Sequence, residues 1–169
     1  MSKTKRLAFM AVLTAVALTV FVIEAQLPTL VPVPGVKPGL ANVITLAAML
    51  LLGRREAGAV LLVRVIMSAM FVGSPATLIY SAAGGALAYA AMCVLTAVIP
   101  EKRLWVTSAI AAVCHNLGQL LCCVLIVKTP GVLAYAPILV VSGMVTGVFT
   151  GFAAMYLVRA VRRSGILSK

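Results

Sequence analysis

The 169-residue chain carries few side chains that could perform acid–base or metal chemistry. Its three acids are Glu24, Glu56 and Glu101, it has no Asp, and His115 is its single histidine. The lack of Asp excludes Asp-rich diphosphate–magnesium sites, an aspartyl dyad and an EF-hand loop. The four cysteines form no CxxC pair, and no acid lies near His115 in sequence, so we predict no metal centre. No nucleophile–base–acid set is visible, so we do not expect an enzyme.

The remaining chemistry lies in polar residues placed inside long apolar stretches. An ionisable side chain in the middle of such a stretch, as Arg64 is, costs at least about 2.5 kcal/mol in a membrane unless it faces a cavity or a partner. His115 and Gln119 are four positions apart and therefore share one face of a helix, with Asn116 beside it. We take as candidate ligand-binding residues Glu24, Lys37, Asn42, Arg64, Tyr80, His115, Asn116 and Gln119.

The composition around these residues is that of a membrane protein. Hydrophobic residues make up 63% and charged residues 10% of the chain, against about 45–50% and about 25% in ordinary soluble domains. The net charge of +11 would suggest a nucleic-acid partner in a soluble protein. Here the basic residues stand in short groups between apolar runs, which is typical of membrane topology, so we expect a lipid bilayer and no nucleic acid.

Six apolar runs approach the length of about 20 residues that a spanning helix needs. They predict an all-α, six-helix transmembrane bundle that forms a single integral membrane domain over residues 1–169. The second run is short, so we expect it to be tilted, extended into its flanks or partly re-entrant. The first run is too long for a signal peptide and has no small-residue cleavage site, so we expect it to be retained. The runs are 7–27, 40–52, 57–73, 78–99, 104–127 and 137–158.

The distribution of basic residues predicts the orientation of the bundle. With a cytoplasmic N-terminus, eleven Lys and Arg residues fall on the inside, and only Lys37 and Lys128 fall on the outside. Arg64 is the one that remains within a span. By the positive-inside rule we predict a multi-pass protein of the plasma membrane with both termini in the cytoplasm.

The polar residues converge on the outer half of the predicted bundle. Arg64 and Gln119 lie roughly 14 Å and 12 Å below the outer ends of their helices, while Asn42, Ser81 and Ser142 lie nearer the outer ends of theirs. Loop 28–39, with four prolines and two glycines, cannot be helical and is predicted to cover this region as a lid. We therefore predict an outward-opening pocket.

Alternatives to this pocket stay open. Loop 28–39 could be an ordinary hydrophobic hairpin at the membrane interface. Asn42, Ser81 and Ser142 could simply form hydrogen bonds between helices, and Arg64 could be a structural clasp. Glu24 lies near the C-terminal end of its helix, where the dipole disfavours a negative charge, so it requires a cation or a hydrogen-bond donor. Lys37 is the nearest candidate in sequence.

Small residues at four-residue spacing predict close helix contacts. Gly143, Gly147 and Gly151 form a GxxxGxxxG stripe in the last run, which is usually a sign of packing within the bundle. Ala11 and Ala15 form an AxxxA pair in the first run. If this pair faces outward, it would suit the docking of a partner membrane protein.

Several segments in combination resemble the Gx transporter family, which is also labelled heptaprenyl diphosphate synthase component I. The resemblance covers nearly the whole chain and implies a likeness to the substrate-binding S components of energy-coupling factor (ECF) transporters. Such components are six-helix bundles with both termini inside, a first outer loop over a vitamin-sized ligand, and an AxxxA surface that meets the transmembrane coupling subunit. The segments are 33–45, the Arg64 run with Gly73 and Ser74, 80–85 and 114–119.

Two functions follow from this resemblance. The first is a substrate-binding subunit for uptake of a small vitamin-like molecule, with a flavin as one candidate, energised by separate ATPases because the chain has no P-loop. The second is a non-transport membrane component of a quinone- or flavin-linked extracellular electron-transfer system. The prenyl-synthase label finds no support in the residues, because isoprenyl condensation needs carboxylate-bound magnesium. We expect no intrinsic cofactor.

Overall fold

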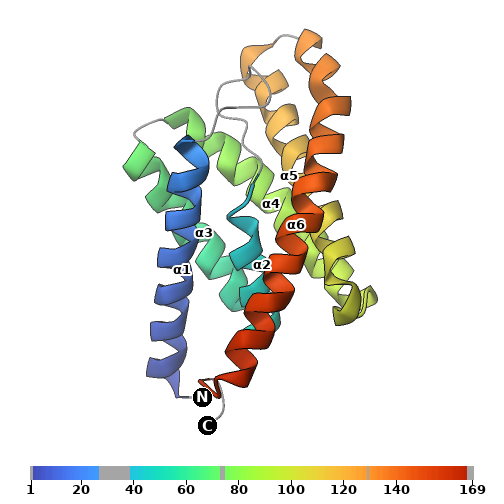
Figure 1. Ribbon diagram of the computed structural model, residues 1–169. Coiled ribbons are helices and arrows are strands. Elements are labelled where there is room, and N and C mark those ends of the chain that lie inside the picture. The colour runs from blue at the N-terminus through green and yellow to red at the C-terminus, as the bar shows by residue number, and fades with distance from the viewer. Residues whose placement is uncertain (1, 27–38, 73–74, 129, 167–169) are drawn as a thin grey trace.

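The computed structural model describes residues 2–26, 39–72, 75–128 and 130–166, and within them the chain folds as a bundle of six α-helices (Figure 1). Two short 3-10 helices, η1 (Glu101–Arg103) and η2 (Pro130–Tyr135), precede the last two α-helices. The all-α, six-helix architecture expected from the sequence is confirmed. The α-helices are α1 (Lys3–Gln26), α2 (Asn42–Leu51), α3 (Arg54–Val72), α4 (Pro75–Val98), α5 (Leu104–Val127) and α6 (Ala136–Arg163).

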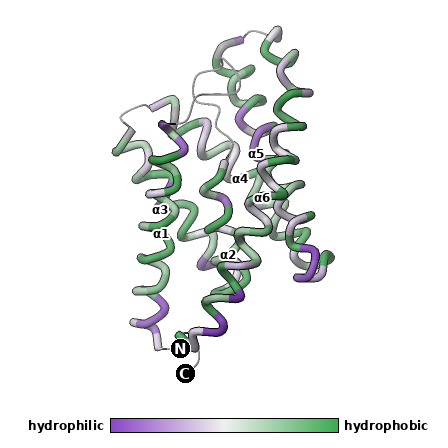
Figure 2. The backbone as a smooth tube through the Cα atoms, viewed as in Figure 1, coloured by the Kyte–Doolittle hydropathy of each residue, from purple (hydrophilic) through white to green (hydrophobic). Residues whose placement is uncertain are grey.

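Four segments of the described chain are long and apolar enough to cross a membrane. They are Lys3–Gln26, Leu78–Val98, Glu101–Ile126 and Pro130–Arg163. Hydrophobic residues predominate along the helices (Figure 2), and many large apolar side chains are exposed, with Met70 and Leu125 each at 77%. So much exposed apolar surface requires a lipid environment, and the protein is a multi-pass membrane protein.

The second and third predicted spans differ from these four. At about 1.5 Å per residue, the 10-residue helix α2 covers only about half of a bilayer core. Helix α3 has 19 residues but begins with Arg54, Arg55 and Glu56 and carries Arg64 in its middle. The predicted shortness of the second run is confirmed, whereas the crossing of the membrane by α2 and α3 stays a prediction.

Helix α2 forms the centre of the bundle. It packs against every other α-helix, from α1 to α6, and most of its residues are buried. A helix that is apolar on all sides is stable only when it is enclosed, and α2 meets this condition with protein rather than with lipid. Around it, α3 packs against both α1 and α4, and α4, α5 and α6 pack against one another in sequence.

Helices α5 and α6 approach closely because α6 presents glycines to α5. A Cβ atom added at Gly147 would lie 2.5 Å from Ala109 Cα, and one at Gly151 would lie 2.5 Å from Trp105 Cα. Helix α4 approaches α5 in a similar way, since a Cβ at Gly118 would lie 2.8 Å from the Ala83 carbonyl oxygen. The predicted close packing at the GxxxGxxxG stripe is therefore confirmed.

Charged residues join several helices at one end of the bundle, here called the basic end. Arg6 pairs with Glu56 at 3.1 Å and donates to the Leu52 carbonyl at 3.3 Å, which ties α1 to the end of α2 and the start of α3. Arg162 of α6 pairs with Glu101 at 2.6 Å. The first turn of α1 and the last turn of α6 thus lie at the same end, as Figure 1 shows. That this end faces the cytoplasm stays a prediction.

Candidate functional site

Polar side chains from several helices meet in the half of the bundle away from the basic end. They surround a cavity of about 10 Å³, and each polar side chain that lines it is at most 6% exposed. Four of the predicted site residues line this cavity directly, and Asn42 contacts one of them. The lining residues are Phe21 and Glu24 of α1, Gly39, Arg64 of α3, Ser81 of α4, and His115 and Gln119 of α5.

The side chain of Glu24, a residue of α1, reaches the backbone just before the start of α2. Its carboxylate accepts a hydrogen bond from the backbone N–H of Gly39, and the N–H groups of Leu40 and Ala41 interact with the same carboxylate. Because α2 begins at Asn42, the negative charge occupies the positive end of the α2 dipole. The predicted need of Glu24 for a donor is met by backbone groups. Lys37, the partner suggested by sequence, lies outside the described residues.

Arg64 is buried beside this acid with an incomplete set of hydrogen bonds. Its side chain is 2% exposed, and the Glu24 carboxylate attracts it electrostatically. One terminal nitrogen donates a long hydrogen bond of 3.5 Å to Asn42 Oδ1. Among the described residues, neither Arg64 Nε nor Asn42 Nδ2 has a hydrogen-bond partner. The charge of Arg64 is therefore compensated, while donors around it remain unused.

His115 is enclosed by two glycines that come from opposite sides. A Cβ at Gly39 would lie 2.7 Å from His115 Cδ2, and one at Gly84 would lie 2.9 Å from His115 Cε1. Gly39 also has a φ of +78°, a left-handed conformation that side chains disfavour. The Gly84 backbone also interacts with the imidazole, although Nδ1 forms no hydrogen bond of good geometry among the described residues. The two glycines thus allow the chain to close tightly over the imidazole.

Asn116 and Tyr80 lie away from the cavity. Asn116 donates from Nδ2 to the Leu139 carbonyl at 2.8 Å and so joins α5 to α6. Tyr80 is buried in a separate apolar cluster with Leu120, Cys123 and Leu139. These positions fit a packing role, and the assignment of the two residues to ligand binding stays a prediction.

The sequence did not single out Phe21 or Gly84 as parts of the site, and it placed Gly39 only at the end of the predicted lid 28–39. Gly39 ends a Pro-Gly pair directly before α2, and this pattern is typical of a turn that needs a positive φ. Gly84 lies in segment 80–85, which carries part of the family resemblance, but nothing in that segment placed it against His115. Phe21 carries no signal in the sequence that distinguishes it from the other apolar residues of α1.

The size of the cavity limits what it can hold in this conformation. A volume of about 10 Å³ is at the lower limit for a single water molecule, whereas pockets for small organic ligands measure about 300–1,000 Å³. The described cluster is therefore closed. It supplies buried donors, an imidazole and one compensated charge pair, which are groups that can recognise a ligand after the cavity has opened.

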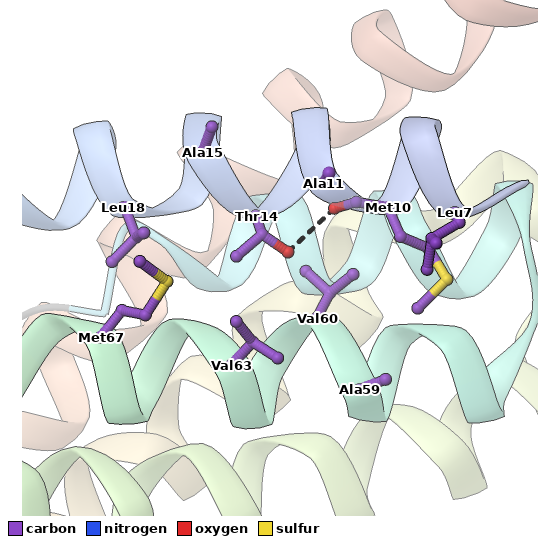
Figure 3. A pocket seen from close by; sticks show the side chains of 10 residues that line it. All are labelled: Leu7, Met10, Ala11, Thr14, Ala15, Leu18, Ala59, Val60, Val63 and Met67. Carbon is purple, nitrogen blue, oxygen red and sulfur yellow. Dashed lines mark hydrogen bonds between the residues drawn. The ribbon is translucent and has the colours of Figure 1, made fainter. Parts of the chain in front are cut away.

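A second hollow lies on the outer surface between α1 and α3 (Figure 3). This groove measures about 380 Å³, and its lining is almost wholly apolar. Ala11 and Ala15 belong to the lining and are exposed, and in Figure 3 Ala15 points away from α3. Their predicted role in contacting a partner requires such exposure.

A comparison with protein families gave a match over most of the chain. The family model described as Heptaprenyl diphosphate synthase component I matches residues 13–157, which include every α-helix in part or in full. Comparisons with curated proteins and with solved structures gave no match.

Proposed function

The chain belongs to the heptaprenyl diphosphate synthase component I family, also known as the Gx transporter family, and on that premise we propose that it is a membrane-embedded substrate-binding subunit. In this proposal it takes up a small vitamin-like molecule, of which a flavin is an example, and a separate ATPase module supplies the energy. The observation that carries the proposal is the enclosed polar cluster around Arg64, which holds unused hydrogen-bonding groups inside an apolar bundle.

The unused groups around Arg64 favour binding over a purely structural role. Leaving a buried polar group without a partner costs about 1–3 kcal/mol, and both Arg64 Nε and Asn42 Nδ2 lack one among the described residues. A ligand with several acceptor atoms would supply the missing partners. The planar fork of an Arg suits the carboxylate or carbonyl edge of a planar molecule.

Opening of the cavity is part of the proposal. Glu24 and Gly39 together form the contact between the end of α1 and the start of α2, directly over His115. Separation of this contact would expose Arg64, His115 and Gln119 to the side of the bundle away from the basic end. We propose that residues 28–39 act as the lid in this movement, although of these residues only Gly39 lies within the described ones.

The energy source and the partner belong to the same proposal. Because the chain contains no P-loop, we propose that a transmembrane coupling subunit and ATPases of an ECF-type module drive uptake. The exposed pair Ala11 and Ala15 is the proposed contact with that coupling subunit. Replacement of both by Leu should abolish assembly and uptake while leaving ligand retention unchanged. Unaltered assembly of this variant would contradict the assignment.

The family description names a prenyl diphosphate synthase component, but we propose binding rather than catalysis for this chain. It has no Asp and three Glu in total, and two of these Glu pair with arginines at the basic end. Glu24 is engaged by backbone N–H groups at the start of α2. No set of carboxylates is then available to hold magnesium against a diphosphate.

Native mass spectrometry of the purified protein tests the proposal. We expect a copurified small molecule, and we expect Arg64→Gln and Gln119→Ala each to weaken its retention by about 1–3 kcal/mol while the bundle stays folded. Arg162→Gln, the same change at the basic end, is the matched control and should retain the ligand. If both site variants hold the ligand as tightly as wild type, the pocket lies elsewhere. A bound quinone instead would favour the electron-transfer alternative.

A further inference from the structure

The groove between α1 and α3 offers nothing to a polar ligand. Of the described residues that line it, Thr14 alone has a polar side chain, and its hydroxyl already donates to the Met10 carbonyl at 2.8 Å (Figure 3). The other lining residues are Leu, Met, Ala and Val. An occupant of this groove must therefore be apolar along its whole length.

The groove is about as long as one leaflet of a bilayer is thick. It runs along α1 from Leu7 to Leu18, which corresponds to about 16 Å of helix. Half of the hydrocarbon core of a membrane measures about 15 Å. The groove begins directly beside the basic end, because Leu7 follows Arg6 in the chain. Its occupant is then an acyl chain of the leaflet at that end.

The charges beside the groove indicate which lipid this would be. Five cations lie in the first turns of α1 and α3, against the single acid Glu56, which already pairs with Arg6. Lys3 is one helical turn before the lining residue Leu7, and Arg55 is one turn before Ala59. Both Lys3 and Arg55 are exposed. A negative head group at the end of the groove would meet these two side chains.

We propose that the groove binds an anionic phospholipid, with one acyl chain between α1 and α3 and the phosphate beside Lys3 and Arg55. Clusters of basic residues at the membrane surface attract anionic lipids, at about fivefold in affinity for each Lys or Arg. This inference does not depend on the small-molecule site, because the groove and the Arg64 cavity share no lining residue. Ala11 and Ala15 belong to the groove lining, so the lipid and the coupling subunit proposed above would occupy this face of α1 in turn.

Lipid exchange on the purified full-length protein tests the proposal. The protein in detergent is given equal amounts of phosphatidylglycerol and phosphatidylcholine with identical acyl chains, and bound lipids are counted by native mass spectrometry. Wild type should retain phosphatidylglycerol selectively. Lys3→Gln with Arg55→Gln should reduce that selectivity by about fivefold per charge removed. The control, Arg159→Gln with Arg163→Gln, removes two charges near the end of α6 and should leave it unchanged.

A second pair of variants tests the groove itself. Val63→Phe fills the groove and should release the retained lipid, whereas Val145→Phe, a matched change at an exposed position of α6, should retain it. Equal retention of both lipid classes by wild type, or full retention by Val63→Phe, would overturn the proposal. So would a neutral prenyl lipid found in the groove. Small-molecule retention, measured on the same samples, should not change in any of these variants.

Discussion

The polar cluster around Arg64 and the ion pairs of the basic end both contain Arg and Glu, but these side chains are buried in the cluster and exposed to a large extent at the basic end. At the basic end, Arg162 and Glu101 lie 2.6 Å apart with side chains 49% and 45% exposed. In the cluster, Glu24 and Arg64 are 3% and 2% exposed, and each depends on protein groups alone. Water completes the hydration of the first pair, whereas the second leaves donors unused. Arg and Glu therefore join helices at the basic end, whereas in the cluster they are candidate ligand-binding groups.

The two regions also act on the same helix from its two ends. Glu24 of α1 accepts from backbone N–H groups at the start of α2, and Arg6 of α1 donates to the Leu52 carbonyl at its end. Each charge opposes the partial charge of the helix terminus that it meets. A helix of 10 residues is marginal by itself. The short core helix is thus held at both ends by a single neighbour, through opposite charges.

The largest effect should come from removing the buried acid. Glu24→Ala leaves Arg64 buried without its counter-charge and the start of α2 uncapped, so we expect it to lower the free energy of unfolding by about 3–5 kcal/mol. Chemical unfolding in detergent measures the change. In an Arg64→Gln background the same substitution should cost less, because no buried charge is left behind. If Glu24→Ala lowered the free energy of unfolding no more than Glu101→Gln does, burial of the Arg and Glu side chains would not make the cluster differ in stability from the basic end.

A smaller loss of stability should follow replacement of either of the two glycines of positive φ that flank α2. Gly39 has φ +78° and Gly53 has φ +116°, and replacement of either by Ala should cost about 1–3 kcal/mol of stability through backbone strain. The two variants should differ in ligand retention. A Cβ at Gly39 meets His115 and Asn42, while one at Gly53 meets only the end of the Glu56 side chain at 3.0 Å.

Ligand retention, measured at a temperature at which both glycine variants are folded, checks this difference. We expect Gly39→Ala to lose the ligand and Gly53→Ala to keep it. Equal retention by the two variants would show that the turn at Gly39 does not belong to the site.

The smallest effect should come from the exposed ion pairs. We expect Glu101→Gln to lower the free energy of unfolding by less than about 1 kcal/mol, because an exposed ion pair is only slightly more stable than its two side chains hydrated separately. The loss should shrink further in high salt, which screens such pairs. Unfolding curves at low and high ionic strength test both points. A large, salt-independent loss would mean that the basic end is as tightly coupled as the cluster.

The sequence by itself determined the elements and much of their packing. Apolar runs separated by charges predicted six helices and a short second one, because these features depend on composition over one segment at a time. The GxxxGxxxG stripe predicted a close contact for α6, since only small residues allow helix axes to approach.

Only the tertiary structure decided which polar groups meet. Sequence depth placed Arg64 and Gln119 at similar levels and Glu24 nearer the outer end, but depth does not specify the direction in which each helix faces. The fold directed these three residues and His115 into one cavity and Asn116 toward α6, and it assigned backbone N–H groups to Glu24. The small volume of the cavity follows from the same cause. It depends on how closely Gly39 and Gly84 approach His115, and that distance is set by helices far apart in the chain.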